Sequence, residues 1–233
     1  MDRLTRKELK SDRFALEVQH SVEYLGEHRR QVTRWGSIAL GVAVLVFAVY
    51  FYRSHQRTVR QEALHDAMLI LNANIGPGGN EYNPMFPTAA ARDAAVDKAF
   101  TDLAAKYSGT DEGYVAQYIL GSTAADKGKV AEAEKRFKMV ADSGTPYAAL
   151  AKLSLAALYN NVSKRAEGEK LLLSLIDHPT ELVSKDTATI ALAQLIAKSD
   201  PQRARKLLEP LRGSPRPTVS KAAITALSEI PQK

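Results

Sequence analysis

An uncharged apolar stretch over residues 35–52 constrains this chain more than any other feature of its sequence. Its eighteen residues would form a helix about 27 Å long, at a rise of about 1.5 Å per residue. The hydrocarbon core of a bilayer is about 30 Å thick, so a helix of this length and composition can cross it. We therefore expect residues 35–52 to form a transmembrane helix.

The two ends of this stretch carry residue types that favour the surface of a membrane. They are Trp35 at the start, Tyr50 and Tyr52 at the end, and Arg34 and Arg53 on either side. Aromatic rings concentrate at the headgroup level, and arginine side chains can extend to the polar surface. A buried core helix would seldom carry arginine at both ends, and a cleaved signal peptide would have a small-residue cleavage site. We expect these five residues to form a retained membrane anchor.

The apolar stretch divides the chain into four regions. They are an amphipathic tail (residues 1–34), the transmembrane helix (35–52), a juxtamembrane helix with a loop rich in glycine and proline (53–87), and a helical domain (88–233). In the tail, Phe14, Val18 and Val22 recur on one side of a predicted helix. Two interpretations of the tail stay open: a helix that lies on the membrane or docks a cytosolic partner, and a marginal helix ordered only by the anchor.

The orientation in the membrane follows from charge and from domain length. Arginines lie on both sides of the apolar stretch, so the positive-inside rule is nearly balanced there. Further basic residues in the first thirteen positions add weight to the tail. A long domain can be translocated largely regardless of its charge. We therefore expect the N-terminus in the cytoplasm and the C-terminal domain on the other side of the membrane.

The residue content argues against several functional classes. The net charge is +6, but basic and acidic residues are mixed along the chain, so we expect no nucleic-acid partner. The absence of cysteine excludes disulfides and thiolate chemistry. The five histidines lack metal-ligand spacing, and no nucleophile or paired-carboxylate motif stands out. We therefore expect no metal, no cofactor and no enzymatic activity.

The chain beyond the span predicts an all-α fold. We expect a helix over residues 54–75, then an irregular loop over residues 76–87, where glycine and proline cluster. From Thr88 onward, helical periodicity alternates with short polar turns, and no convincing strand occurs. The expected turns are at residues 108–109, 127–128, 143–145, 160–161, 178–179, 199–201 and 213–215.

Similar residues recur at a regular distance within these helices. Gly121, Ala156 and Leu192 occupy one such position, separated by 35 (156 − 121) and 36 (192 − 156) residues. The other matched positions form the sets Ala133, Phe137 and Val140; Gly168, Leu172 and Leu175; and Ala204, Leu208 and Leu211. Small residues allow two helices to approach closely, and larger apolar ones fill the space between neighbouring pairs. This pattern indicates stacked helical hairpins, with an irregular helical bundle as the alternative.

The spacing resembles the tetratricopeptide repeat, a helix–turn–helix unit of about 34 residues. Two positions depart from the family pattern, since Gln117 and Ala124 stand where aromatic residues are usual. The predicted fold is all-α: an N-terminal single transmembrane helix followed by a short tetratricopeptide-like solenoid of helical hairpins. Nearly the whole chain resembles bacterial membrane-anchored proteins related to the ancillary subunit of the Sec translocon. The resemblance implies a single-pass protein of the inner membrane whose repeats face the periplasm.

The resemblance also implies a peptide groove lined by the first helix of each pair. The implied groove residues are Val115, Tyr118, Ser122, Leu153, Ala157, Asn160, Thr189 and Ala193. For Tyr118 and Leu153, ordinary packing between helices is an equally open interpretation. Cytosolic chaperone-binding members hold a terminal carboxylate with lysine and asparagine, but no lysine matches here. A mildly apolar groove suits extended or helical peptide segments.

The function expected from these features is that of an adaptor. Its implied partners are translocon subunits, exported or periplasmic polypeptides, and the lipid bilayer that holds its anchor. The alternative is a structural scaffold of a cell-envelope assembly, such as the division or outer-membrane machinery, without client handling.

Overall fold

A computed structural model describes residues 29–80, 82–160 and 164–231. The described chain divides into two units, one that ends at Val59 and one that begins at Arg60. Most of the predicted amphipathic tail, residues 1–28, lies outside the described residues. The two units are described separately below.

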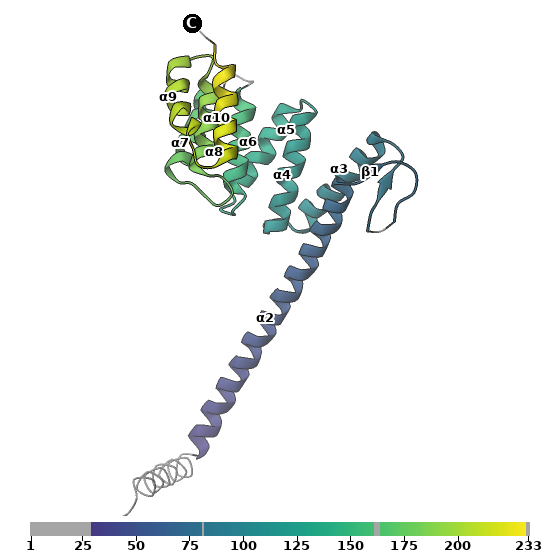
Figure 1. The fold of residues 1–233 in the computed structure, drawn as a ribbon. Coiled ribbons are helices and arrows are strands. Elements are labelled where there is room, and N and C mark those ends of the chain that lie inside the picture. The colour runs from purple at the N-terminus through teal and green to yellow at the C-terminus, as the bar shows by residue number, and fades with distance from the viewer. Residues whose placement is uncertain (1–28, 81, 161–163, 232–233) are drawn as a thin grey trace, which may run out of the picture. The chain divides into compact units, whose positions relative to one another are not determined.

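A long helix, α2 (Arg29–Leu71), contains the apolar stretch (Figure 1). Its segment Thr33–Leu71 is long and apolar enough to cross a membrane, and its most apolar part buries nothing inside the protein. Large side chains of this part are exposed, for example Trp35 at 69% and Phe47 at 64%. The helix extends the predicted span in both directions, and it ends at Leu71 rather than at the expected residue 75.

The loop after α2 is more ordered than its glycine and proline content predicted. Two short strands, β1 (Asn74–Ile75) and β2 (Met85–Phe86), pair in parallel. The expectation of an irregular loop is therefore corrected, because two-residue strands are too short to produce an alternating pattern. The turn that brings β2 beside β1 requires a glycine at position 79. Gly79 has a φ of +112°, and a Cβ there would lie 2.7 Å from the backbone nitrogen of Met85.

The rest of the described chain is helical, as predicted. Its helices are α3 (Ala89–Lys106), α4 (Asp111–Asp126), α5 (Val130–Ala141), α6 (Ala148–Asn160), α7 (Arg165–Asp177), α8 (Lys185–Ile196), α9 (Pro201–Arg212) and α10 (Pro217–Glu229). The predicted turns at residues 108–109, 127–128, 143–145, 178–179, 199–201 and 213–215 fall at junctions between these helices. The turn predicted at residues 160–161 lies partly outside the described residues, since α6 ends at Asn160 and the description resumes at residue 164. The all-α class is confirmed.

Local capping explains where several of these helices begin. The side chains of Thr88, Thr110, Ser184 and Asp200 each accept a hydrogen bond from a backbone N–H in the first turn of the following helix. Such bonds satisfy donors that the helix itself cannot pair. Pro201, at the first position of α9, loses no intrahelical hydrogen bond.

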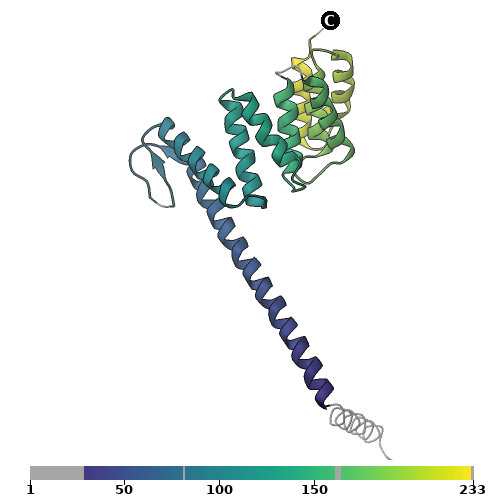
Figure 2. The same cartoon turned by 180° about the vertical axis from the view of Figure 1, so that it is seen from behind.

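The helices pair as hairpins at the predicted repeat spacing (Figure 2). The hairpins are α4–α5, α6–α7 and α8–α9, and each helix packs against its neighbours in the chain. The repeated positions are buried: Phe137, Leu172 and Leu208 are at most 2% exposed. Gly121 lies against the ring of Phe137, where a Cβ would come within 2.9 Å of it. The repeat pattern therefore specifies the contact surfaces of the hairpins.

The compact unit begins before the predicted boundary at residue 88. Ala67 of α2 is buried with Phe100 and Leu103 of α3 in one hydrophobic cluster. Because the last turns of α2 carry this apolar side, they pair with α3 as a first hairpin. The unit therefore starts at Arg60, within the predicted juxtamembrane helix and loop of residues 53–87.

Candidate functional site

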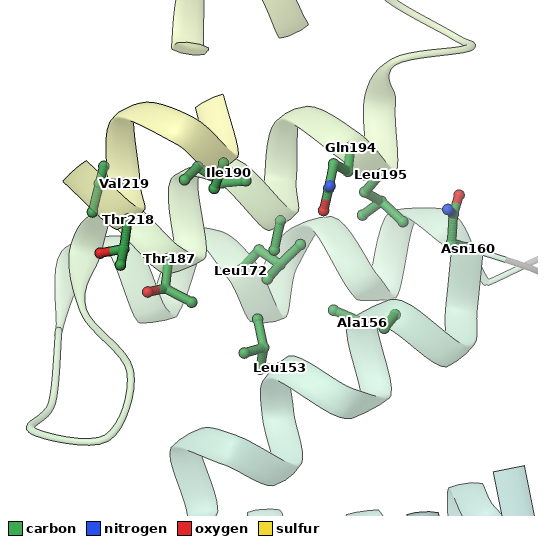
Figure 3. Close-up of a pocket in the computed structure, with 13 residues that line it drawn as sticks. Leu153, Ala156, Asn160, Leu172, Thr187, Ile190, Gln194, Leu195, Thr218 and Val219 are labelled. Atoms are coloured by element: carbon green, nitrogen blue, oxygen red, sulfur yellow. The ribbon is translucent and has the colours of Figure 1, made fainter. Parts of the chain in front are cut away.

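A cavity of about 470 Å³ opens between α6, α8 and α10, with α7 contributing to its floor. Figure 3 shows the side chains that line it. From here on it is called the α8 cavity. Its lining consists of Leu153, Ala156, Ala157, Asn160, Leu172, Thr187, Ile190, Ala191, Gln194, Leu195, Thr218, Val219 and Ala222.

The lining is apolar in most of its residues and neutral throughout. Leu153, Leu172 and Leu195 come from three different helices, and the polar contributions are amides and hydroxyls. None of the described residues that line the cavity carries a formal charge. Ligand sites commonly combine an apolar surface with a few polar groups that set orientation.

Three polar side chains of the lining lack hydrogen-bond partners among the residues that the structure describes. Asn160, Gln194 and Thr218 are exposed, and their side chains make no hydrogen bond to another residue of the described part. Thr187 differs, because its hydroxyl oxygen lies 2.9 Å from that of Ser184. The two carboxamides each offer donors and an acceptor to a ligand, while the Thr218 hydroxyl can donate or accept.

Packing of α8 determines which of its side chains reach the cavity. Ala188, Leu192 and Ile196 are buried in the main core. Since a residue turns a helix by about 100°, the opposite positions, including Ile190 and Gln194, face the opening. The start of α10 is held to the start of α8 by an ion pair between Arg216 and Asp186. Helix packing and this ion pair therefore hold α8 and α10 together at the α8 cavity.

Three of the residues predicted for the groove line this cavity. They are Leu153, Ala157 and Asn160, all on α6. The resemblance to the repeat family, in which the first helix of each pair lines the groove, was the signal that implied them. Whether they contact a peptide stays a prediction.

Tyr118 and Ser122 lie away from the α8 cavity, on α4. The hydroxyl of Tyr118 is 3.1 Å from the hydroxyl of Ser154 on α6. The Tyr118 ring also lies against that of Phe137, with ring centroids 5.6 Å apart. Tyr118 therefore joins two neighbouring hairpins, in agreement with the packing interpretation that the sequence left open.

Val115 and Ala193, which were also predicted for the groove, do not line the α8 cavity. Both are buried, and Ala193 is 0% exposed, because neighbouring helices cover them. Thr189 is half-buried, and its hydroxyl donates a hydrogen bond to the carbonyl of Lys185 in the same helix. On α8, the positions one residue later, Ile190 and Gln194, line the cavity instead.

The wall formed by α10 was not found from the sequence. Thr218, Val219 and Ala222 belong to this helix and follow the third repeat. Pro217 at its first position was the available signal for a helix start. The helix has no repeated partner in the sequence, so the spacing argument did not extend to it.

A charged cluster around Glu134 joins the hairpins α4–α5 and α6–α7. One oxygen of Glu134 accepts from Lys138 at 2.7 Å, from Lys164 at 2.6 Å and from the Tyr159 hydroxyl at 3.0 Å. The hydrogen bond from Lys138, followed by that from Lys164, lowers the pKa of Glu134 from 4.5 to about 2. The carboxylate is therefore ionised at neutral pH and links α5, the end of α6 and the turn before α7.

Residues suited to metal chemistry are not brought together in the part of the chain that the structure describes. No group of three or more histidine, aspartate or glutamate side chains there could hold a metal ion. A second cavity of about 150 Å³ contains Asp97, Lys127, Glu132 and Arg136. There Lys127 pairs with Asp97 at 2.7 Å, and Arg136 pairs with Glu132 at 2.9 Å. These charges neutralise one another across α3, α4 and α5.

Comparison with known proteins identifies one family. A family model described as a tetratricopeptide repeat-like domain matches residues 31–174, more than half of the chain. The matched region includes the apolar stretch of α2 as well as the hairpin α4–α5 and most of α6–α7. Neither the curated proteins nor the solved structures contain a match to this chain.

Proposed function

Since the chain belongs to the family of tetratricopeptide repeat-like domains, we propose that it is a membrane-anchored adaptor that binds polypeptides in the α8 cavity. Stacked helical repeats provide extended surfaces for other proteins. The observation that carries the proposal is the neutral, mainly apolar lining, whose amides at Asn160 and Gln194 are open to a ligand. The proposed activity is binding, without catalysis.

The apolar part of α2 is the proposed anchor. Its side chains are exposed, from Trp35 to Tyr52, and exposed apolar surface of this extent is costly in water. In a bilayer the same side chains would lie in hydrocarbon, while Arg34 and Arg53 would reach the headgroups. An anchor restricts the binding domain to the membrane surface and so raises its effective concentration near other membrane proteins.

The proposed location is the bacterial inner membrane, with the N-terminus in the cytoplasm and the repeat domain in the periplasm. The resemblance to proteins related to the ancillary translocon subunit supports this assignment, as does the short basic tail. The partners would then be translocon subunits and exported or periplasmic polypeptides. A reporter fused after Lys233 tests the topology, because an enzyme active only in the periplasm would work only in the proposed orientation.

Photo-crosslinking in intact membranes tests the binding site. A photoreactive residue at position 157 replaces an exposed alanine of the cavity lining. The matched control is position 105, an exposed alanine on α3 outside the cavity. We expect polypeptide adducts from position 157 and few from position 105. Adducts with lipids alone would contradict the proposal.

The proteins captured by the crosslinker separate the adaptor from the scaffold. Many different exported polypeptides together with translocon subunits would support an adaptor. A single partner at a fixed ratio would instead support a structural scaffold of an envelope assembly. Affinity capture of the full chain in mild detergent independently measures how many partners bind it and in what ratio to the chain.

A further inference from the structure

The polar and apolar groups of the α8 cavity are arranged in sequence along it. Figure 3 shows Asn160 and Thr218 at opposite ends, with Leu172 and Ile190 between them. Building on the proposed function, we infer that the cavity binds an extended polypeptide segment through an uncharged aliphatic side chain and the backbone on either side of it. The site requires no terminal carboxylate.

The neutral lining determines the side-chain preference. Leu153, Leu172 and Leu195 offer apolar contacts, and none of the described lining residues could pair with a charge. Transfer of an ionised side chain into such a site is unfavourable unless an opposite charge or several hydrogen bonds compensate. An aliphatic side chain needs no such compensation. The absence of lysine and arginine from the lining likewise leaves a terminal carboxylate without a cationic partner.

The open carboxamides determine the backbone preference. Asn160 on α6 and Gln194 on α8 can each donate to a carbonyl and accept from an N–H. A bound α-helix has already paired its own backbone groups, so it would leave these amides with nothing to bind on its apolar face. An extended segment has free N–H and C=O groups along its length. The two amides and the Thr218 hydroxyl therefore fit an extended chain.

Peptide binding to the full chain in phosphatidylcholine nanodiscs tests this inference. The probe is a short fluorescent peptide with one central leucine among serine and glycine, amidated at its C-terminus. Matched peptides replace the leucine with aspartate or lysine, or carry N-methyl groups on the flanking amides. We expect binding to be weaker by about tenfold or more for the charged peptides. We expect it to be weaker by about fivefold for the N-methylated peptide.

Two variants connect these effects to the cavity. Ala157→Trp fills the opening from an exposed position, and Ala105→Trp places the same side chain on α3. We expect the first to abolish peptide binding and the second to leave it unchanged. Gln194→Leu removes one carboxamide at similar size, so we expect it to reduce the effect of N-methylation. Circular dichroism verifies that each variant is folded.

The outcomes separate failure of the inference from failure of the proposed function. Equal binding of the leucine and charged peptides, with both lost in Ala157→Trp, would overturn the inference and leave the polypeptide-binding site in place. Two further peptides, the leucine peptide with a free C-terminal carboxylate and a helix-constrained version of it, extend the comparison. Tighter binding of either one than of the amidated extended peptide would also overturn the inference. A fluorescent fatty acid serves as the non-peptide probe. If none of the peptides binds, and the fatty acid binds to the unmodified chain but not to Ala157→Trp, the proposed function itself fails.

Discussion

The Nε atom of Arg60 donates a hydrogen bond to the Oε2 atom of Glu112 at 3.0 Å, which joins α2 to α4 across 52 positions of the chain. The Glu112 side chain is 9% exposed and that of Arg60 is 24% exposed. Among the described residues, Glu112 is a charged residue that is buried, and it lies in the first turn of α4. The pair therefore fixes the first hairpin to the second through a charge that is largely removed from water.

Loss of the carboxylate at this pair should destabilise the repeat unit. Glu112→Ala leaves Arg60 partly buried without its partner, so we expect the free energy of unfolding to fall by about 2 to 3 kcal/mol. Thermal unfolding of the full chain in mild detergent, followed by circular dichroism, measures the change. Lys98→Ala is the control, because it breaks an exposed pair with Asp102 and should cost about 0.5 kcal/mol or less. Equal losses in the two variants would contradict the assigned role of Glu112.

A methyl group at Gly121 should weaken the contact between α4 and α5. A Cβ there would lie 2.9 Å from the ring of Phe137, which is 2% exposed and has little room to move. We expect Gly121→Ala to lower the free energy of unfolding by about 1 to 3 kcal/mol. Gly213→Ala is the control, because nothing lies within 4 Å of its added Cβ. Chemical denaturation compares the two, and an unchanged midpoint for Gly121→Ala would refute the close-contact argument.

The cluster around Glu134 should make stability depend on acid pH. Hydrogen bonds from Lys138 and Lys164 lower the pKa of this carboxyl from 4.5 to about 2 in the folded protein. The ionised carboxylate therefore stabilises the fold above about pH 4.5, and this contribution is lost as the pH falls towards 2. Glu134→Gln should unfold at a lower temperature than the unmodified protein at pH 7, by the equivalent of about 1 to 2 kcal/mol.

The difference in unfolding temperature between Glu134→Gln and the unmodified protein should shrink steadily as the pH is lowered below 4.5. Unfolding temperatures measured at a series of pH values test this dependence. A difference that stays constant down to the lowest pH would show that Glu134 acts through packing rather than through its charge.

A charge in the middle of the apolar stretch should weaken membrane insertion. Replacement of Leu45 by arginine changes the free energy of insertion by about 3 to 4 kcal/mol in the unfavourable direction. We expect Leu45→Arg to move a large share of the protein out of the membrane pellet after an alkaline carbonate wash. Tyr82→Arg is the control, since Tyr82 is 82% exposed and lies outside the stretch. Equal retention of both variants would contradict the proposed anchor.

The sequence was sufficient to predict the helices because their ends depend on nearby residues. Thr88 and Asp200 cap the helices that follow them through bonds to N–H groups three residues away. The repeat was likewise visible, because equivalent residues such as Phe137, Leu172 and Leu208 fill equivalent spaces between hairpins. Periodicity of this kind requires no knowledge of distant contacts.

The site was only partly predictable, because exposure depends on what packs against each helix. On α6 the transferred positions reach the cavity, whereas on α8 Ala193 is enclosed and Gln194 is open. One residue turns a helix by about 100°, so a small error in alignment exchanges a buried face for an open one. The wall contributed by α10 lies beyond the last repeat and followed no pattern.

Sequence alone therefore determined the all-α class, the apolar helix and the spacing of the hairpins, since each depends on residues within one or two turns of a helix or on a short repeat. Tertiary structure decided the first hairpin between α2 and α3, the Arg60–Glu112 pair and the lining of the α8 cavity. The physical reason is that burial and pairing are properties of surfaces brought together by folding. Residues 52 positions apart, such as Arg60 and Glu112, carry no local signal that they will meet.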